Sequence, residues 1–318
     1  MIDQLITLSQ TVSSSGLAGS KTYYKVIQEL GNGGNSAVYL VEATSGQNRG
    51  VLFAMKVFTK IGDTTRLARF LQEVQVLQKY THPAIMRVYD TGMVAGEKDG
   101  GAVAYPFLIA DYLPQTLRSV MLSGTFPMAS KLAFCLQMLS GLAYLSSLDP
   151  QIVHRDIKPE NIFVKGKSFI LGDFGLIKSL NTSAVEKEDE KIADKTFILD
   201  SVGPRLPRFY RTPDLVDYCR NKGSITTKSD VYQLGLVFAE VFTGEVPQQR
   251  CKEILDPVVP VPLGKISGSQ EISIRTQIEK MLDADVERRP PAANLFDGWE
   301  GIFRSIVNDS HALEGKVF

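Results

Sequence analysis

The chain is short of the residues that mark disulfide-bonded and zinc-binding proteins. It has only three cysteines in 318 residues, and Cys135, Cys219 and Cys251 lie far apart, with neither a disulfide framework nor a zinc-ligand spacing. There is also no excess of charge of one sign, because 35 Lys and Arg balance 35 Asp and Glu to a formal net charge of +0. We therefore expect free thiols in a reducing compartment, and no field that draws the chain to nucleic acid or to a membrane.

Long hydrophobic runs are missing as well. The most apolar stretch, Val231–Phe242, is interrupted by Gln233 and Glu240 and is too short to span a bilayer. The first ten residues contain Asp3 and no basic segment, so they do not resemble a secretory signal. With a hydrophobic content of 44% and a charged content of 22%, the composition is that of a globular protein, and we expect a cytoplasmic one.

Short runs of β-forming residues dominate the first third of the chain. Residues 1–20 are rich in Ser, Thr and Gly and precede any clear periodicity, so we expect a flexible or loosely docked leader there. Apolar side chains at helical spacing over Leu67–Leu77 predict one helix that ends before His82-Pro83. Residues 96–101 are predicted to form an exposed hairpin extension. The predicted strands are residues 24–30, 37–43, 51–58, 85–89 and 104–110.

After Pro114 the pattern becomes helical. Residues 229–242 are apolar on nearly all sides, as in a helix buried in a core. A mostly β first third and a mostly helical remainder predict an α+β fold in two parts. Residues 305–318 are predicted to be a C-terminal tail. The other predicted helices cover residues 132–143, 272–282 and 292–306.

The most informative motif is the polar run His154–Asn161, which is followed twelve residues later by Asp173–Gly175. Its residue types suit the transfer of a phosphoryl group to a hydroxyl group. Asp156 can accept the proton of the attacking hydroxyl, and Lys158 can neutralise charge on the transferred phosphate. Carboxylate and amide oxygens are hard ligands that suit Mg²⁺. The motif therefore predicts catalytic roles for Asp156, Lys158 and Asn161, and Mg²⁺ ligation by Asn161 and Asp173.

In order and spacing this motif resembles the catalytic and metal loops of the eukaryotic-like serine/threonine protein kinase family. The resemblance spans residues 21–304 and implies the two-lobed protein kinase fold. It places a small β-rich N-lobe at residues 21–110, a hinge at 111–114 and a larger, mainly α-helical C-lobe at 115–304. It also implies ATP and Mg²⁺ as cofactors, Mn²⁺ as an alternative metal, and a protein as the substrate. The oligomeric state stays open.

The resemblance includes the segment that would hold the phosphates. Glycines between the first two predicted strands would let backbone N–H groups approach phosphate oxygens, and Ser36 stands where the family has its third glycine. Lys56, in the middle of an apolar strand, needs an anion. Glu73 on the following helix is implied to orient it. Lys56 and Glu73 thus join the implied catalytic set, and the implied phosphate loop is Gly31, Asn32, Gly33, Gly34, Asn35 and Ser36.

Residues 107–113 resemble the strand that leads into the hinge of the family. By that resemblance the carbonyl of Asp111 and the N–H of Leu113 would bond the edge of adenine. Ala110 would close the back of the pocket, and its small side chain would leave that pocket enlarged. A register slip of one residue would place Ile109 there instead. The side chains implied to sandwich the adenine ring are Val38, Ala54 and Phe163.

Arg155, which precedes Asp156, resembles the arginine that pairs with a phosphate on the activation segment. The segment between Asp173 and Asp214 contains several hydroxyl acceptors, and Thr196 and Ser201 are the leading candidates because they lie near its end. We therefore expect a phosphate on this segment to be the partner of Arg155.

Three further residues are implied to be structural. Asp230 resembles the buried helix aspartate that fixes the backbone of the catalytic loop. Thr212-Pro213-Asp214 replaces the usual Ala-Pro-Glu at the end of the activation segment. Asp214 is one methylene shorter than the family glutamate, and its expected partner is Arg289.

Two features point to different hydroxyl substrates. Lys158 is characteristic of serine/threonine kinases, whereas Pro207, on the substrate side, is more typical of tyrosine kinases. Because Lys158 belongs to the chemical step, we expect a serine/threonine kinase that also phosphorylates its own activation loop, with dual specificity left open. A pseudokinase scaffold would need a lost catalytic residue, and none is lost. A small-molecule kinase is disfavoured by Asp214, Asp230 and Arg289.

Overall fold

The computed structural model describes residues 10–14, 21–98, 101–124, 126–180, 194–195, 210–253 and 255–314. The chain divides into two compact units. The first consists of Met1–Thr81 and Met86–Pro114, and the second of His82–Ile85 and Gln115–Phe318.

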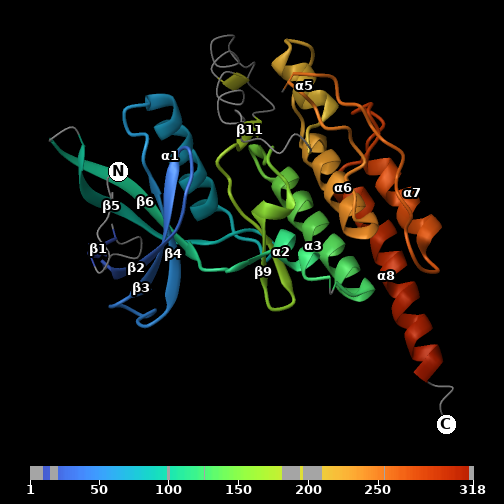
Figure 1. Cartoon of the computed structure of the whole chain (residues 1–318), viewed down its shortest axis with the longest axis horizontal. Helices are drawn as coiled ribbons and strands as arrows, with labels where there is room; N and C mark the ends of the chain where they lie inside the picture. Colours follow the sequence, from blue (N-terminus) through green and yellow to red (C-terminus); the bar gives the residue numbers. More distant parts are fainter. Residues whose placement is uncertain are drawn as a thin grey trace. The chain divides into compact units, whose positions relative to one another are not determined.

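The described part of the first unit is one antiparallel sheet and one helix. Its elements are β1 (Thr11–Ser13), β2 (Tyr23–Asn32), β3 (Ser36–Ala43), β4 (Leu52–Phe58), α1 (Thr64–Lys79), β5 (Val88–Lys98) and β6 (Gly101–Asp111). The strands lie in the order β1-β2-β3-β4-β6-β5 (Figure 1). Helix α1 begins where the Asp63 carboxylate caps the N–H of Arg66 at 3.0 Å, and it ends before the predicted His82-Pro83 stop.

The two faces of this sheet differ in what they bury, because residues two apart on a strand share a face. Phe53, Met55 and Val57 of β4 pack into a hydrophobic cluster with the side chains of the neighbouring strands. Ala54 and Lys56, which alternate with them, therefore belong to the opposite face. This second face carries Val38, Ala54, Lys56 and Ala110 of the predicted nucleotide-binding residues.

The expected leader at residues 1–20 is partly built into the sheet. Thr11–Ser13 form β1, which pairs with β2, and Val12 is only 4% exposed in the hydrophobic cluster. Ser14 bridges to Gly92, where an added Cβ would lie 2.5 Å from the ring of Phe107. The burial of Val12 and this close approach favour the docked alternative for the described residues of this segment.

The predicted hairpin extension is the end of the β5–β6 ladder, in which residues 96–98 pair with residues 101–103. One predicted boundary in the first unit was wrong. The strand predicted at residues 85–89 begins only at Val88, since Ile85 pairs with Leu171 and belongs to the second unit.

The second unit is mainly helical. Its helices are α2 (Leu117–Leu122), α3 (Met128–Ser147), α5 (Pro213–Cys219), α6 (Thr227–Thr243), α7 (Glu271–Met281) and α8 (Ala292–Glu314), with the short 3₁₀ helix η1 (Pro159–Asn161). Short strands form two small antiparallel sheets, ordered β10-β9-β7 and β11-β8. These strands are β7 (Gln115–Thr116), β8 (Gln151–Val153), β9 (Ile162–Lys165), β10 (Ser168–Leu171) and β11 (Lys178–Leu180).

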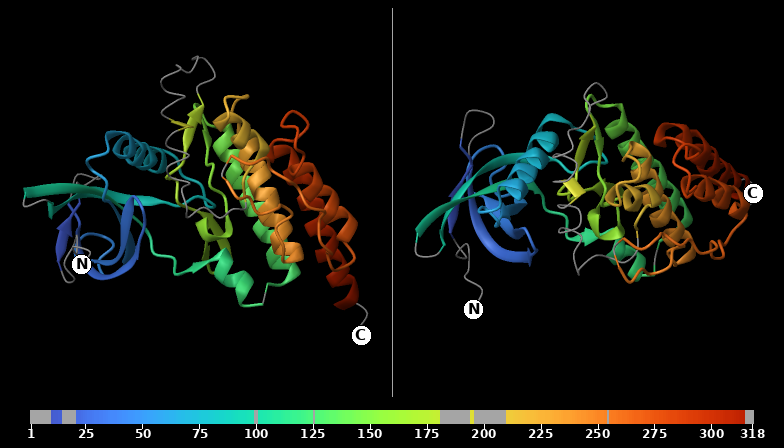
Figure 2. Two further views of the ribbon diagram at one scale, coloured as in Figure 1. Left: turned by 45° about the horizontal axis from the view of Figure 1, so that its top comes forward. Right: turned by 90° about the horizontal axis from the view of Figure 1, so that it is seen from above.

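Helix α6 is the centre of this unit. Every residue from Ser229 to Phe242 is buried, as its all-round apolar pattern predicted. Helices α3 and α8 run side by side in both views of Figure 2, and α3 also packs on α6. The last helix continues to Glu314, beyond the tail boundary predicted at residue 305.

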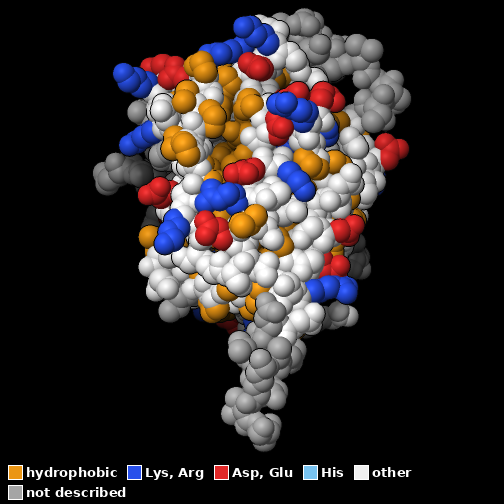
Figure 3. All heavy atoms as spheres, turned by 90° about the vertical axis from the view of Figure 1, so that its right-hand side faces the viewer, with side chains coloured by type: hydrophobic (Ala, Val, Ile, Leu, Met, Phe, Trp, Pro, Cys, Tyr) orange, Lys and Arg blue, Asp and Glu red, His pale blue; other side chains and the backbone are white. Residues whose placement is uncertain are grey.

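One helix among the described residues, α3, is long and apolar enough to cross a membrane by length and composition alone. It contacts α6, α8 and β10, and its Leu132, Phe134 and Leu139 are fully buried. Core packing therefore accounts for its apolar composition. The face shown in Figure 3 mixes Lys and Arg with Asp and Glu, and its hydrophobic side chains gather in one area.

Candidate active site

The glycine-rich segment forms the tip of the β2–β3 hairpin. The N–H of Gly33 donates to the carbonyl of Ser36 at 2.8 Å and closes a turn over Gly34 and Asn35. The side chain of Asn35 accepts a hydrogen bond from Arg66 of α1, which ties the tip to the helix. A Cβ added at Gly34 would meet nothing within 4 Å, so the tip has open space beside its backbone. The other predicted residues of this segment, Gly31 and Asn32, are the last two residues of β2.

Lys56 forms an ion pair with Glu73. The Lys56 Nζ lies 2.8 and 3.0 Å from the two carboxylate oxygens. The Lys56 side chain is 19% exposed and that of Glu73 only 3%. Phe58 at the end of β4 stacks on Phe70 of α1, with ring centroids 5.4 Å apart, and so holds the helix over this face of the sheet. The strand lysine thus has the anion that its apolar surroundings require.

Val38, Ala54 and Ala110 share the sheet face of Lys56. Residues directly opposite one another on paired strands project to the same side, and Ala54 pairs with Ala110 while Val38 pairs with Lys56. Ile109 is fully buried in the cluster on the other face. The structure therefore places Ala110, and not Ile109, on the sheet face of the lysine, opposite Ala54. Of the other implied adenine contacts, Asp111 ends β6, Leu113 follows it in the first unit, and Phe163 lies half-buried on β9 of the second unit.

The second unit gathers the polar residues of the His154–Asn161 run around one carboxylate. Lys158 Nζ lies 2.9 and 2.7 Å from the two oxygens of Asp156. Asn161 Nδ2 donates to the Asp156 carbonyl and to its Oδ2, each at 2.8 Å. Both neighbours hold Asp156 in one orientation, as a group that must meet a substrate proton requires.

Burial changes the acidity of this carboxyl group. The pKa of Asp156 is raised from 3.8 to about 6, chiefly by desolvation and also by the nearby charge of Asp173, while Lys158 and Asn161 oppose the rise. A carboxylate with a pKa in this range is a stronger proton acceptor than an ordinary aspartate, and it is still ionised at neutral pH.

Asp173 follows β10 with a left-handed backbone, φ 55°. Beside it, Phe174 is fully buried, and its ring lies edge-on to that of His154 with centroids 4.5 Å apart. This contact joins the Asp173–Gly175 turn to the start of the catalytic run. The unusual φ is thus fixed by packing of the next residue.

Asn161 and Asp173 fit a magnesium site that is completed by other ligands. Because the Asn161 amide nitrogen donates to Asp156, its oxygen is the atom directed elsewhere. Among the described residues, no group of three or more His, Cys, Asp or Glu could hold a metal ion. Mg²⁺ commonly takes only one or two protein oxygens and fills its shell with water and phosphate.

The backbone of the catalytic run is held by α6. The two oxygens of Asp230 accept the N–H groups of His154 and Arg155 at 2.7 and 2.8 Å. Burial raises the pKa of Asp230 to about 7, and the two N–H donors and Arg155 counter that rise. Gln233, one turn further along α6, accepts the N–H of Ile157 at 3.0 Å and donates to the Arg155 carbonyl at 3.0 Å. We had not predicted Gln233, although it lies on the same helix face as Asp230.

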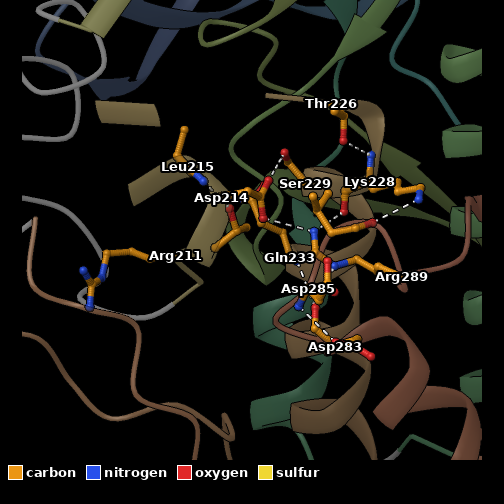
Figure 4. A network of polar contacts seen from close by, with 12 residues as sticks. Arg211, Asp214, Leu215, Thr226, Lys228, Ser229, Gln233, Asp283, Asp285 and Arg289 are labelled. Carbon is orange, nitrogen blue, oxygen red and sulfur yellow. Dashed lines mark hydrogen bonds and ion pairs between the residues drawn. The ribbon is translucent and has the colours of Figure 1, made fainter. Parts of the chain in front are cut away.

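Asp214 and Arg289 form the expected buried ion pair at 3.1 Å (Figure 4). The Arg289 side chain is fully buried and also donates to the carbonyl oxygens of Lys228 and Asp283. Ser229 donates to the other oxygen of Asp214. The shorter aspartate therefore still reaches its arginine, with a serine completing the network.

Arg155 has a partner that the sequence did not predict. Its Nη1 lies 2.8 Å from Oδ2 of Asp194, and its Nε and Nη2 donate to the carbonyls of Leu176 and Ile177. The predicted phosphorylation sites, Thr196 and Ser201, lie outside the described residues, as does Pro207.

A second unpredicted network lies next to the catalytic run. Arg118 of α2 donates to Glu160 at 2.7 Å and to Glu240 of α6 at 2.6 Å, and also to the hydroxyl of Tyr210. Glu240 is 8% exposed, so its charge is neutralised inside the unit. Arg118 and Glu240 are 122 residues apart, and only the fold brings them together.

Comparison with known proteins gives a consistent picture. Residues 24–298 match the family model described as protein kinase domain. The chain is 29% identical over 227 residues to the serine/threonine-protein kinase PrkC of Bacillus subtilis, covering 70% of this chain and 31% of that protein. It is 28% identical over 287 residues to PknL of Mycobacterium tuberculosis, covering 89% and 59%. It is 25% identical over 284 residues to pkn2 of Myxococcus xanthus, covering 85% and 31%. The chain thus spans between about a third and three fifths of the length of these relatives.

Proposed function

The chain belongs to the protein kinase family, and from this premise we propose that it transfers the γ-phosphate of ATP to serine and threonine hydroxyl groups of proteins. The predicted family resemblance is confirmed by the match over residues 24–298. The observation that supports the activity most directly is Asp156, a buried carboxylate held by Lys158 and Asn161. A pseudokinase would lack one of these groups.

Each polar residue has a distinct part in the proposed reaction. Asp156 orients the attacking hydroxyl and accepts its proton, because its raised pKa suits that transfer at neutral pH. Lys158 lies against this carboxylate and supplies positive charge where the phosphate would move. Lys56, oriented by Glu73, would bind the α- and β-phosphates.

Asn161 and Asp173 are the residues that would hold Mg²⁺, or Mn²⁺ in its place. The bound metal would neutralise phosphate charge when ATP is present. Before that, Asp173 is positioned by the packing of Phe174 against His154, and Asn161 by its hydrogen bonds to Asp156. Both oxygen ligands therefore belong to segments that are fixed within the second unit.

Three finer parts of this proposal rest on the sequence. The chain would phosphorylate its own activation loop as well as a protein substrate, and dual specificity is the alternative because Pro207 is typical of tyrosine kinases. We propose a cytoplasmic location, which the three free thiols of Cys135, Cys219 and Cys251 support. The net charge of +0 gives no reason to expect nucleic acid or a membrane among the partners.

The test is a phosphoryl-transfer assay with γ-labelled ATP, Mg²⁺ and a generic basic protein. We expect label on serine and threonine, and its loss when Mg²⁺ is chelated. Asp156→Asn should reduce transfer by about 10³-fold, since a positioned proton acceptor contributes about 10²–10⁴-fold. Equal transfer by the wild type and this variant would overturn the role of Asp156. Phosphoamino-acid analysis that finds phosphotyrosine as well would establish dual specificity instead.

A further inference from the structure

Three donors, one from the catalytic run, one from β11 and one from α5, converge on one oxygen of Asp194. Arg155 Nη1 lies 2.8 Å from Oδ2, the Lys178 Nζ of β11 lies 3.2 Å from it, and the Tyr218 hydroxyl of α5 donates to it at 3.0 Å. The Asp194 side chain is 6% exposed and that of Arg155 only 1%. This is a buried, fully formed anion site, and its occupant is a carboxylate of the chain itself.

Arg155 connects this anion to the catalytic run. Its Nε and Nη2 donate to the carbonyls of Leu176 and Ile177, directly after the Asp173–Gly175 turn. Its own N–H is held by Asp230, and its φ of 68° is left-handed. The guanidinium therefore joins the segment that carries Asp173 to the backbone next to Asp156, and its orientation bears on both.

The guanidinium needs a counter-charge to stay buried in this position. Its two other contacts are with carbonyl oxygens, which bear no net charge, and removing one member of a buried ion pair leaves an uncompensated charge at high cost. Lys178 adds a second cation to the site, and Lys195 places a third over the ring of Tyr218, 5.0 Å from its centroid. Among the described residues of this cluster, Asp194 is the acidic residue that pairs with both Arg155 and Lys178.

We propose that Asp194 is a positioning residue that takes the place of an activating phosphate. It neutralises Arg155 and Lys178, and through Arg155 it keeps Asp156 and the Asp173 turn in their working arrangement. The kinase is then fully active without phosphate on the segment between Asp173 and Asp214. This inference rests on the proposed function, and it replaces the expected phosphate partner of Arg155 with a carboxylate that needs no second enzyme.

The first experiment compares phosphatase-treated and autophosphorylated full-length protein, with phosphate content checked by intact mass. We expect the two forms to differ by less than about threefold in kcat, a gap below 1 kcal/mol. Asp194→Asn in the phosphate-free form should lose about tenfold or more in kcat, with a smaller change in the KM for ATP. Asp194→Glu should recover part of that loss. The control is Asp217→Asn, an exposed carboxylate on the same helix as Tyr218, which should change neither quantity.

A second experiment separates positioning from simple loss of stability. Asp194→Ala should leave an anion site lined by Arg155, Lys178 and Tyr218, and added inorganic phosphate or sulfate should restore part of its kcat. The same anions should not rescue Asp194→Ala/Arg155→Leu, because the cation that receives them is gone. A Tm measured for each variant reports folding, and anion rescue of kcat is a response that general destabilisation does not give.

The outcomes distinguish this inference from the function beneath it. No transfer by the wild type in either phosphorylation state would overturn the proposed kinase activity itself. Transfer by the phosphorylated form alone, or an Asp194→Asn variant with wild-type kcat and no anion response, would overturn only the role of Asp194.

Discussion

The two units hold their functional residues in different ways. In the sheet unit, Lys56 forms an ion pair with Glu73, and its side chain is 19% exposed. In the helical unit, the catalytic run is fixed through its backbone by Asp230 and Gln233, both buried in the central helix α6. One arrangement depends on a long side chain meeting a carboxylate, and the other on main-chain N–H groups meeting buried acceptors.

The difference indicates which parts can adjust. A lysine and a glutamate that meet at the ends of their side chains can separate when either the strand or the helix moves, and the partly exposed lysine can still be solvated afterwards. If Asp230 of α6 moved away, the N–H groups of His154 and Arg155 would lose their acceptors in a buried environment. We infer that the first unit supplies a contact that can be made and broken, while the second supplies a fixed frame.

The largest effect should come from breaking the buried Asp214–Arg289 ion pair of the second unit. Asp214→Ala leaves the fully buried Arg289 without its carboxylate, and we expect a loss of about 3–5 kcal/mol in the free energy of unfolding. The measurement is chemical denaturation. Arg288→Leu is the matched control, because Arg288 is 71% exposed and pairs with Asp283 at the surface, where such pairs contribute about 0–1 kcal/mol. Similar losses for both variants would contradict the buried-frame account.

The second prediction separates the contribution of the Lys56–Glu73 pair to stability from its contribution to phosphoryl transfer. Lys56→Met removes the lysine that pairs with the buried Glu73, so it should cost on the order of 2–3 kcal/mol in stability and abolish transfer. Adding Glu73→Gln should recover part of the stability but none of the transfer. Denaturation and the transfer assay, run on the same preparations, check both halves. Recovery of transfer by the double variant would show that Lys56 acts only as a partner for Glu73.

A third prediction concerns pH. Because the pKa of Asp156 is raised to about 6, transfer should fall as the pH drops through that value and the carboxyl group takes up a proton. Lys158 lowers the pKa of Asp156. In Lys158→Met that pKa should therefore rise, and the acidic limb of the residual activity should move to higher pH. The exposed Lys167→Met should leave the profile unchanged. A profile without a limb near pH 6 in the wild type would argue against proton acceptance by Asp156.

The raised pKa of Asp156 also affects stability, which should rise as the pH falls, whereas activity should fall. Folding buries a carboxyl group whose pKa is above its ordinary 3.8, so its ionised form weakens the folded state at neutral pH. That penalty should decline as the pH falls through about 6, and it should be gone below about 3.8. In Asp156→Asn, this part of the pH dependence of unfolding should disappear.

The smallest effect should be at the hairpin tip. Gly34→Ala adds a Cβ into open space at a position without positive φ, so both the Tm and the KM for ATP should change little, the latter by less than about threefold. Gly235→Ala is the contrasting case, because its Cβ would lie 2.8 Å from that of Met281 in the core. A large loss of ATP affinity in Gly34→Ala with unchanged stability would show that the tip needs glycine for the nucleotide itself.

What the sequence revealed and what it missed follow from how far apart the partners lie along the chain. Asp156, Lys158 and Asn161 are within six residues of one another, so their spacing was readable directly. The burial of α6 was predicted because its apolar residues leave no polar stripe. Residues 11–13 were missed because three residues in a polar segment carry no periodic signal, and only the adjacent strand buries Val12.

The unpredicted polar contacts have a common cause. Asp194 is 39 residues from Arg155, and Glu240 is 122 residues from Arg118. A charged residue in a loop has the same composition whether it meets water or a buried arginine, and only the fold decides between them. Gln233 could have been found, since it lies one helical turn from Asp230 on a helix with few other polar side chains.

The proposal that Lys56 and Asp173 each contribute to the binding of Mg²⁺ and ATP is tested most directly by a binding titration. Titration of a non-hydrolysable ATP analogue with Mg²⁺ into the wild type, Lys56→Met, Asp173→Asn and the double variant gives four dissociation constants. The account predicts that each single change weakens binding by about tenfold or more, and that the double variant binds no better than either single variant. Wild-type affinity in either single variant at saturating Mg²⁺ would contradict it.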